Sequence, residues 1–526
     1  MQSLRAFIAR HSSFSIALGV AFAYFLLQLS VINDFGVTWD EPLHRNWGKI
    51  FYLFWRSGDR HLLELMPGHG MNYGPLYYLV NYLFSEQLYR AHVLSFVASN
   101  HLLNLVVAAG AVGLIFLLGE RMFHRRVGFL AVLFFVFFPP LIAHAHYNPK
   151  DIPVMTGVLM TAYVFVRALG SGSVSLFVLT GLLLGLSIAL KMNALLMLPV
   201  CAVSYLLWRW ERGESIVQKQ SLRTILFVSL AIVFGTIFAW PSAWGDLRLI
   251  PQSIHFFLTE SFWPGKVLYF GKEYAGADLP WFYSPLEYLM TMPVLMVGFF
   301  AVGFWFVARC SFARFDVPTH PDSLPPRASK SVFLLLWIAF PLLVSITPHL
   351  VRYDGMRQFF FCLPAIAIVA AVGCDRFLSW ISSKTIQPVL VTSVSLLLLL
   401  GSLLHEVWIV HPFEGSYRNE VVRFFYPHDL DQVFQIEYWG PSYLQGMEWL
   451  VEHAEPNPIL CVPTAGILVT WYPWRDDFTV ECSALSNYVM FFTRYSEVQQ
   501  YVFQAMPPVF TIERMGSTLL KMYKVK

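Results

Sequence analysis

The sequence predicts a polytopic α-helical membrane protein with about eleven transmembrane helices and a small C-terminal α/β domain. Three observations support this fold class. The chain of 526 residues is 56% hydrophobic and only 13% charged, whereas soluble domains carry about 25% charged residues. Long apolar stretches recur through residues 1–408, which we expect to form the transmembrane domain. Residues 409–526 instead alternate short apolar runs with charges and Pro–Gly turns, as expected for an extracytoplasmic domain.

A membrane span needs roughly 20 mainly apolar residues. The stretches that meet this requirement are 14–33, 93–118, 128–145, 153–169, 174–190, 192–208, 222–240, 286–308, 332–348, 358–375 and 387–408. No small-residue cleavage site follows the first stretch, so we expect it to remain as an uncleaved span.

The lysines and arginines of the short loops predict the orientation, because basic loops stay in the cytoplasm. Alternate loops are basic, with Arg5, Arg10, Arg121, Arg125, Arg126, Arg209, Arg212, Lys219, Arg223, Arg309, Arg314, Arg327, Lys330, Arg376 and Lys384. The N-terminus is then cytoplasmic. An odd number of spans places the C-terminal domain on the opposite, periplasmic or extracellular side.

Three segments are expected on the outer face, at 34–92, 241–285 and 409–526. The first should contain a helix lying in the membrane interface, from Trp47 to Trp55. The C-terminal segment should contain a helix at Tyr443–His453 and strands at Ile459–Val462, Tyr488–Thr493, Val509–Glu513 and Leu519–Tyr523.

Charge and cysteine content exclude some classes of function. The net charge of +3 is spread over loops, with no basic patch for nucleic acid. The six cysteines form no CxxC pair and no zinc-binding spacing. Cys461 and Cys482 both lie in the outer C-terminal segment, and two interpretations remain open for them: a disulfide or two buried free thiols.

Asp40 and Glu41 follow closely on the outer end of the first expected span. A carboxylate within hydrogen-bond reach of an alcohol or amide can act as its general base. The same residues can also begin a helix, with Asp40 as the N-cap and Pro42 in the first turn. The two interpretations are compatible if Glu41 serves the helix start while Asp40 carries the chemistry.

The segment Asn148–Pro153 lies between two expected spans that are too close for a true loop. Ionisable residues at membrane depth usually have a function. Lys150 can face a phosphate, and Asp151 can bind a metal or orient an acceptor. A Pro-punctuated turn with a snorkelling lysine explains the same residues. His144 and His146 precede this segment, either as a metal pair or, more simply, as interfacial histidines bonded to their neighbours.

Further polar clusters occur at the outer ends of other spans. Lys191 either snorkels to the interface or pairs with an anion. Arg352 and Arg357 flank a Gly turn and can grip a phosphate bidentately, unless they form Arg–Asp interface pairs. The aromatic segments 263–272 and 280–283 could form a lid over an amphiphilic substrate, or an ordinary aromatic belt.

Nucleotide-binding and hydrolase motifs are absent from the sequence, which has no P-loop, no GxSxG and no HExxH. An enzyme working on the outer face would have no access to cytosolic nucleotide donors. A group transferase of this kind would therefore take its donor from a lipid carrier.

Several motifs together resemble the GT-C superfamily of integral membrane glycosyltransferases. They are TWDEP, NYGPLYYL, NPKDIP, WPGKVLYFGKEY with PWFY, RYDGMRQFFFCLP, HPFEGSY and EYWGPSY. Their order is most similar to bacterial members of glycosyltransferase family 39, which are related to protein O-mannosyltransferases and the lipid A aminoarabinose transferase. The resemblance implies a bacterial inner-membrane enzyme.

The resemblance also implies an inverting transfer of a sugar from a polyprenyl-phosphate donor to a lipid, glycan or protein acceptor. Asp40 matches the essential acid of the first outer loop and would be the general base, with Glu41 as the second acid. The expected ligands of the donor phosphate are Lys150, Lys191, Arg352 and Arg357. The expected substrate-binding residues are His44, Tyr73, Asn148, Asp151, Tyr269 and Tyr353.

Two other functions remain open at this point. A lipid transporter or flippase would need polar residues at mid-span, whereas the polar clusters here lie at outer span ends. A non-catalytic envelope scaffold would use the C-terminal domain as its binding surface. No ligand cluster in the sequence requires a metal, although some relatives use a divalent ion.

Overall fold

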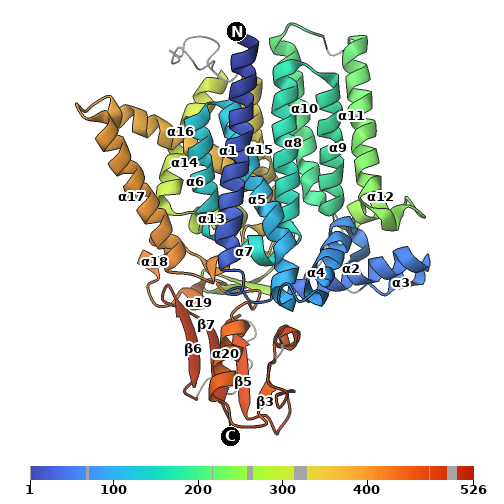
Figure 1. Cartoon of the computed structure of the whole chain (residues 1–526), viewed down its shortest axis with the longest axis vertical. Coiled ribbons are helices and arrows are strands. Elements are labelled where there is room, and N and C mark those ends of the chain that lie inside the picture. The colour runs from blue at the N-terminus through green and yellow to red at the C-terminus, as the bar shows by residue number, and fades with distance from the viewer. Residues whose placement is uncertain are drawn as a thin grey trace.

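The computed structural model describes residues 2–66, 70–215, 217–257, 263, 265–312, 328–472, 474–494 and 506–525. A layer of long helices occupies one part of the molecule, and a small domain with a β-sheet lies at one end of that layer (Figure 1). The N-terminus is at the opposite end of the helices from this domain (Figure 1). This arrangement confirms the predicted fold class.

The helices of the layer follow the apolar stretches of the sequence. They are α1 (Gln2–Ser30), α5 (Phe96–Met122), α6 (Arg125–Val136), α7 (Pro139–Tyr147), α8 (Asp151–Ser171), α9 (Val174–Leu190), η2 (Met192–Leu196) leading into α10 (Met197–Glu211), α11 (Lys219–Phe238), α14 (Val294–Phe312), α15 (Ala328–Ser345), η5 (Arg357–Cys362) leading into α16 (Leu363–Ser382), and α17 (Pro388–Trp408).

The number of full-length spans is smaller than the eleven predicted. Within the described residues nine helices are long and apolar enough to cross a membrane, or ten if the bent pair α6–α7 is one span. The bend of 68° between α6 and α7 comes at Pro139–Pro140, where proline removes backbone donors. The remaining predicted stretch, 174–190, forms the apolar helix α9, which has only 17 residues.

Helix α16, together with the short helix η5 before it, is the centre of the layer. In the span Arg357–Ser382, 94% of the residues in the apolar window are buried, against 17% for α1 and 11% for α17. Close packing on α14 depends on glycine. A Cβ at Gly303 would lie 1.8 Å from the carbonyl oxygen of Val369, and one at Gly373 would lie 1.9 Å from that of Phe299. Small residues therefore let the two backbones touch.

The end of the layer nearest the C-terminal domain carries the shorter elements. They are α2 (Asp40–Ser57), α3 (His61–Glu64), η1 (Gly70–Asn72), α4 (Leu76–Arg90), η3 (Pro241–Ala243), α12 (Leu249–His255), β1 (Lys266–Tyr269), β2 (Lys272–Ala275), α13 (Tyr283–Thr291), η6 (Glu414–Ser416), α18 (Glu420–Phe425) and α19 (Leu430–Val433). Helix α2 covers residues 47–55, where a helix in the membrane interface was predicted. It buries Trp47 and Phe51 and exposes Trp55, which is the amphipathic pattern of an interfacial helix.

The C-terminal domain is a mixed sheet covered by one helix. Its elements are α20 (Tyr443–His453), β3 (Ile459–Cys461), η7 (Gly466–Trp471), β4 (Thr479–Val480), β5 (Tyr488–Phe492), β6 (Phe510–Arg514) and β7 (Ser517–Lys524). The strand order is β4-β3-β5-β7-β6, with β3 parallel to its two neighbours and β7 antiparallel to β5 and β6. The predicted helix and the four predicted strands are confirmed, and β4 was not predicted.

The large outer loop fastens this domain to the helices. Strands β1 and β2 form a hairpin, and Tyr269 pairs with Phe434 across an isolated bridge. The backbone N–H of Gln435 donates to the carbonyl of Leu268 at 2.9 Å, and that of Gly271 donates to Val433 at 2.9 Å. Segments distant in sequence are thus hydrogen-bonded at the junction of the two domains.

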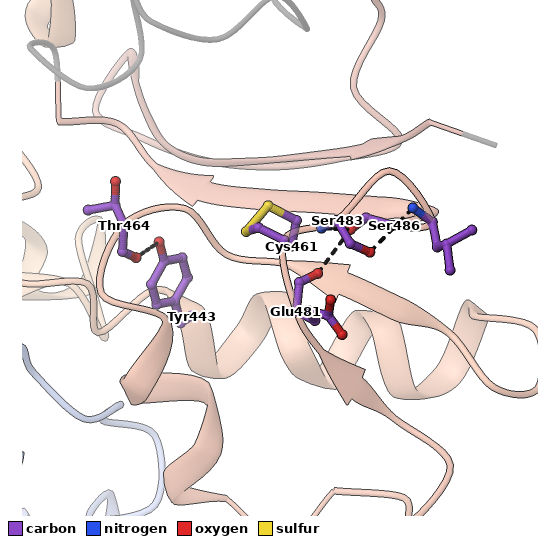
Figure 2. Close-up of a disulfide and its surroundings, with 8 residues drawn as sticks. Tyr443, Cys461, Thr464, Glu481, Ser483 and Ser486 are labelled. Atoms are coloured by element: carbon purple, nitrogen blue, oxygen red, sulfur yellow. Dashed lines mark hydrogen bonds between the residues drawn. A yellow bond between two sulfur atoms is a disulfide. The ribbon is translucent and has the colours of Figure 1, made fainter.

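Cys461 and Cys482 form a disulfide, which decides between the two interpretations left open by the sequence. The bridge joins β3 to the segment after β4, and the hydroxyl of Ser486 donates to the carbonyl of Glu481 beside it at 2.9 Å (Figure 2). Disulfides persist in oxidising compartments.

Removing the disulfide by Cys482→Ser is expected to lower the free energy of unfolding of the C-terminal domain by about 3 kcal/mol, because the bridge closes a loop in the unfolded chain. The two cysteines are 21 residues apart in sequence. Thermal melting of the purified protein, followed by near-ultraviolet circular dichroism, measures the change. Cys310→Ser in α14 is the matched control and should leave this transition in place. An unchanged transition in Cys482→Ser would contradict the expectation.

Candidate active site

Asp40 is the first residue of α2, at the junction between the helices and the C-terminal domain. It does not cap the helix, because Trp39 precedes it as the N-cap residue without a side-chain cap hydrogen bond. Its side chain is 29% exposed and lies beside Arg357, whose Nη1 donates to Asp40 Oδ2 at 3.1 Å. The carboxylate is thus held in place by a cation and still reachable by a substrate.

The electrostatic surroundings keep Asp40 ionised. Burial alone would raise the pKa of this carboxyl, but the charges of Arg357 and Lys150 hold it below the ordinary value for aspartate. At neutral pH, Asp40 is therefore a carboxylate that can accept a proton.

Glu41 points the other way and fixes the start of α2. It is 1% exposed. Its Oε1 accepts from the backbone N–H of Thr38 at 2.8 Å and from the Thr38 hydroxyl at 3.0 Å. Its Oε2 lies 3.0 Å from Nε2 of His101 on α5. Glu41 thus holds the start of α2, which is one of the two roles that the sequence left open for it.

Arg357 is the central cation of the site. Besides Asp40, it pairs with Asp354 (Nη2 to Oδ2, 2.8 Å) and lies 3.9 Å from Asp151. Its guanidinium carbon is 4.7 Å from the ring centroid of Trp439 and 5.2 Å from that of Tyr353. One side chain therefore connects the first outer loop, the 352–357 turn, α8 and the C-terminal domain.

The backbone before Arg357 explains this position. Asp354 and Gly355 both have positive φ, at 55° and 66°, and form a left-handed turn. The hydroxyl of Tyr283 accepts the N–H of Gly355 at 2.9 Å and holds that turn. Asp354 and Arg357 are three residues apart across it, so their side chains meet.

Asn148, Asp151 and Lys191 form a second cluster next to Arg357. Oδ1 of Asn148 accepts the backbone N–H of Asp151 at 2.9 Å at the start of α8, and its Nδ2 donates to Asp151 Oδ2 at 2.9 Å. Lys191 Nζ donates to Asp151 Oδ1 at 2.5 Å. Two motifs that are 40 residues apart in sequence thereby meet in one ion pair.

Lys150 is held by aromatic rings. Its Nζ lies 4.0 Å from the ring centroid of Tyr73 and 5.9 Å from that of Trp47. Within the described parts of the chain, no carboxylate oxygen lies within 4.0 Å of this ammonium. Burial lowers the pKa of Lys150, whereas Tyr353 and Asp40 act in the opposite direction. Among Lys150, Lys191 and Arg357, Lys150 is thus the one without a carboxylate partner in the described structure.

His44 lies behind this cluster on the buried side of α2. Its ring stacks on Tyr78 at 5.1 Å between centroids and is 4% exposed. Burial, followed by the charge of Lys150, lowers the pKa of His44 to about 3, so the ring is neutral. His44 therefore contributes packing and a neutral ring rather than a charge.

Arg352 and Tyr269, predicted as ligands of the donor phosphate and the substrate, lie outside this cluster. The guanidinium of Arg352 is 2% exposed and donates to the backbone carbonyls of Leu279 (2.5 Å) and Pro280 (3.0 Å). These bonds leave it unable to grip a phosphate. Tyr269 is 1% exposed and packs on Tyr283, with 4.9 Å between ring centroids, in the core at the domain junction.

The C-terminal domain contributes residues that the sequence did not suggest. Arg494, just after β5, lies over the rings of Trp39 and Trp263. No sequence signal marks this arginine. A signal did exist for Asn100 and His101 on α5, whose side chains contact Oε2 of Glu41, because both are polar residues inside an apolar stretch.

Glu437 organises the loop that brings Trp439 to Arg357. Its Oε1 accepts the backbone N–H of Trp439 at 3.1 Å and of Gly440 at 2.9 Å. The other oxygen is buried without a partner in the described structure. Burial raises the pKa of Glu437 to about 7. This carboxyl therefore changes charge near neutral pH, next to the site.

Glu437→Gln is expected to stabilise the protein at pH 8 by about 3 kcal/mol, because each unit of pKa shift is worth about 1.4 kcal/mol. The folded-state pKa is raised to about 7. The stability due to protonation is thus present below the ordinary glutamate pKa and is lost as the pH rises through about 7. Melting temperatures at pH 5 and pH 8 test this. The difference between the melting temperatures at pH 5 and pH 8 should become smaller in Glu437→Gln. It should stay as in the wild type in the control Glu452→Gln, which lies on the exposed face of α20.

A divalent metal would need several ligands, and the described residues do not offer them together. Among those residues there is no group of three or more His, Cys, Asp or Glu side chains placed to hold a metal ion. Asp40, Asp151 and Asp354 are each paired with a cation instead. His144 is bonded to Asn148, with 2.6 Å between Nδ1 and Nδ2.

The chain resembles known proteins both in sequence and in fold. Residues 96–240 match the sequence model of a family described as dolichyl-phosphate-mannose-protein mannosyltransferase. The apo crystal structure of ArnT from Cupriavidus metallidurans superposes with a TM-score of 0.52 at 13% identity, over 98% of this chain and 98% of that one. The chain has the GT-C fold. This confirms the resemblance suggested by the motifs.

Other matches of the GT-C type are more distant. ArnT from Cupriavidus metallidurans bound to undecaprenyl phosphate gives a TM-score of 0.48 at 12% identity, with 97% of each chain covered. The apo oligosaccharyltransferase of Archaeoglobus fulgidus gives 0.46 at 12% identity, over 86% of this chain and 62% of that one. No curated protein sequence matches the chain. The family model and the fold both belong to glycosyltransferases, and the chain is a multi-pass integral membrane protein.

Proposed function

We propose that this GT-C protein is an inverting glycosyltransferase that uses a polyprenyl-phosphate sugar and works on the non-cytoplasmic face of the membrane. One observation carries the proposal. An ionised, reachable carboxylate, Asp40, lies beside a cluster of cations formed by Arg357, Lys191 and Lys150. A transferase that displaces a phosphate needs a base for its acceptor and positive charge for its leaving group.

The reaction is a single displacement. Asp40 takes the proton from the acceptor hydroxyl or amine, and the acceptor atom attacks the anomeric carbon of the donor sugar. The bond from that carbon to the phosphate oxygen breaks, and polyprenyl phosphate leaves with both bonding electrons. Because attack and departure occur on opposite faces of the sugar carbon, its configuration inverts.

The cations divide the work of holding the phosphate. Lys150 is the first ligand in this proposal, because it is not paired with a carboxylate among the described residues. Lys191 and Arg357 are shared with Asp151 and Asp40 and add positive charge to the same place. The charge of the leaving phosphate increases during the reaction, so fixed cations stabilise the transition state more than the ground state.

The proposed location is the bacterial inner membrane, with the N-terminus in the cytoplasm and the C-terminal domain in the periplasm or outside the cell. The basic loops support this orientation. The disulfide between Cys461 and Cys482 also supports an oxidising compartment for that domain. The acceptor is a lipid, a glycan or a protein.

A reconstituted assay tests the function. Purified protein in vesicles receives a polyprenyl-phosphate sugar labelled in the sugar, together with an envelope extract from a deletion strain as the source of acceptor. We expect the label to leave the donor and to appear on an acceptor in the extract. Movement of intact donor across the vesicle bilayer without transfer would instead identify a transporter. An inert protein in both measurements would favour a scaffold.

A further inference from the structure

Arg494 is a cation of the C-terminal domain that faces the membrane domain between two tryptophan rings. Its guanidinium carbon lies 5.7 Å from the ring centroid of Trp39 and 5.2 Å from that of Trp263. Trp39 directly precedes Asp40, and Trp263 belongs to the large outer loop. Three separate segments of the outer face thus meet at this side chain.

The backbone of Arg494 is held firmly. It follows β5, the central strand of the sheet. The N–H of Thr493 donates to the carbonyl of Leu519 at 2.8 Å, and the N–H of Arg494 donates to that of Phe492 at 2.9 Å. The backbone that carries the guanidinium is therefore anchored to the sheet.

The rings and arginines form a closed circuit beside Asp40. Trp263 stacks on Tyr353, with 4.7 Å between centroids and 10° between planes. Tyr353 lies against Arg357, and Arg357 lies against Trp439. The circuit closes where the N–H of Trp39 donates to the carbonyl of Trp439 at 2.9 Å. A chain of contacts between aromatic rings and two arginines therefore begins and ends at Trp39, the residue before Asp40.

Arg494 retains capacity for a ligand. The residue is 8% exposed. Within the described residues, its guanidinium makes one long hydrogen bond, from Nη1 to the carbonyl of Tyr438 at 3.4 Å. A guanidinium has five N–H donors arranged to bind carboxylate or phosphate oxygens in pairs. Trp39, which is 36% exposed, offers an apolar ring face next to these donors.

We propose that Arg494, Trp39 and Trp263 form the acceptor subsite, and that it takes a saccharide bearing an anionic group, either phosphate or carboxylate. This inference rests on the proposed transferase function. The donor cations Lys150 and Lys191 belong to the membrane domain, whereas Arg494 belongs to the C-terminal domain. In a single displacement the acceptor approaches from the side opposite the leaving phosphate, so separate cations can serve the two substrates.

Binding of defined probes to the full-length protein in nanodiscs tests the subsite. The soluble probes are glucose 6-phosphate, glucuronate and glucose, and the donor-side probe is undecaprenyl phosphate. We expect the wild type to bind at least one of the two anionic sugars about 10-fold more tightly than glucose, because a guanidinium forms stronger, charge-assisted hydrogen bonds with phosphate or carboxylate oxygens than with a neutral hydroxyl. The two anionic probes distinguish phosphate from carboxylate.

Variants separate this subsite from the donor site. Arg494→Gln should abolish the preference for the anionic sugar and leave undecaprenyl phosphate binding unchanged, whereas Arg494→Lys should keep part of the preference. Lys150→Met should instead weaken undecaprenyl phosphate binding and leave the preference for the anionic sugar unchanged. Arg475→Gln is the matched control, because Arg475 lies in the same domain and pairs with Asp477. It should change neither affinity.

Two outcomes would overturn the inference. The first is a wild-type protein that binds the anionic sugars no better than glucose. The second is an Arg494→Gln variant whose undecaprenyl phosphate affinity falls together with its sugar affinity, which would assign Arg494 to the donor site. A failure of all variants and the wild type to bind undecaprenyl phosphate, with the sugar preference intact, would instead count against the proposed donor.

Discussion

Asp40→Asn is expected to lower the rate of sugar transfer by about 10³-fold, since general-base catalysis is typically worth 10²–10⁴-fold. The amide is similar in size to the carboxylate and still offers an oxygen to Arg357, but it cannot take the proton of the acceptor. The start of α2 should be unaffected, because Asp40 makes no cap hydrogen bond there. The measurement is the initial rate of transfer in the reconstituted assay.

Asp59→Asn is the matched control for Asp40→Asn. Asp59 lies just beyond the other end of α2, is exposed, and accepts the backbone N–H of His61 at 3.0 Å. The substitution makes the same chemical change in the same outer segment and should leave the rate unchanged. Undecaprenyl phosphate binding and thermal melting report whether Asp40→Asn folds normally. Full activity in Asp40→Asn would show that another group is the base.

Much of the fold could be predicted because it depends on local pattern. Helix α20 was predicted at its observed bounds, Tyr443–His453, from its apolar spacing. Strand β4 was missed because a pair of only two residues gives no alternation to detect. The bend between α6 and α7 depends on Pro139–Pro140, whose effect on a span is not read from hydropathy.

The site was predictable only as a set of candidates. Charged residues at outer span ends pointed to Asp40, Asp151, Lys191 and Arg357, and the structure brings these together. The sequence did not distinguish Arg357 from Arg352, since both flank the same turn. The difference arises from the tertiary fold, because the guanidinium of Arg352 is hydrogen-bonded to backbone carbonyls of a loop distant in sequence.

Contacts between domains account for what the sequence missed. Arg494 follows an ordinary strand, and it meets Trp39 and Trp263 only after the C-terminal domain has docked on the outer loops. Trp439 reaches Arg357 through the same docking. Such long-range contacts leave no local pattern. The C-terminal domain therefore contributes side chains to the candidate site.

Arg357→Gln is expected to lower transfer by about 10²–10³-fold, the size of effect seen when one preorganised electrostatic donor is removed from an active site. The substitution removes the cation that Asp40, Asp151 and Asp354 share. Without it, the pKa of Asp40 should rise, because Arg357 is the largest of the charges that lower it. As the pH is lowered, the remaining activity of the variant should therefore be lost at a higher pH than that of the wild type. A pH–rate profile measures this shift.

The same substitution also tests stability. Breaking a buried ion pair by removing one partner typically costs about 3–5 kcal/mol, and Arg357 and Asp354 are both buried. Adding Asp354→Asn to Arg357→Gln removes one uncompensated charge and should recover part of the melting temperature without recovering transfer. Arg357→Lys should lie between the wild type and Arg357→Gln, since an ammonium keeps the charge but lacks the planar fork.

Arg376→Gln is the control and should leave transfer unchanged, because Arg376 lies near the far end of α16, in the span that η5 begins at Arg357. The decisive comparison is the double variant. Because Arg357 both compensates buried carboxylates and faces the reacting groups in the proposed mechanism, its two roles predict different behaviour when Asp354 is neutralised. If Asp354→Asn restores transfer along with stability, Arg357 acts only as a structural counter-ion. If stability returns while transfer and the wild-type pH profile do not, the guanidinium acts on the reaction itself.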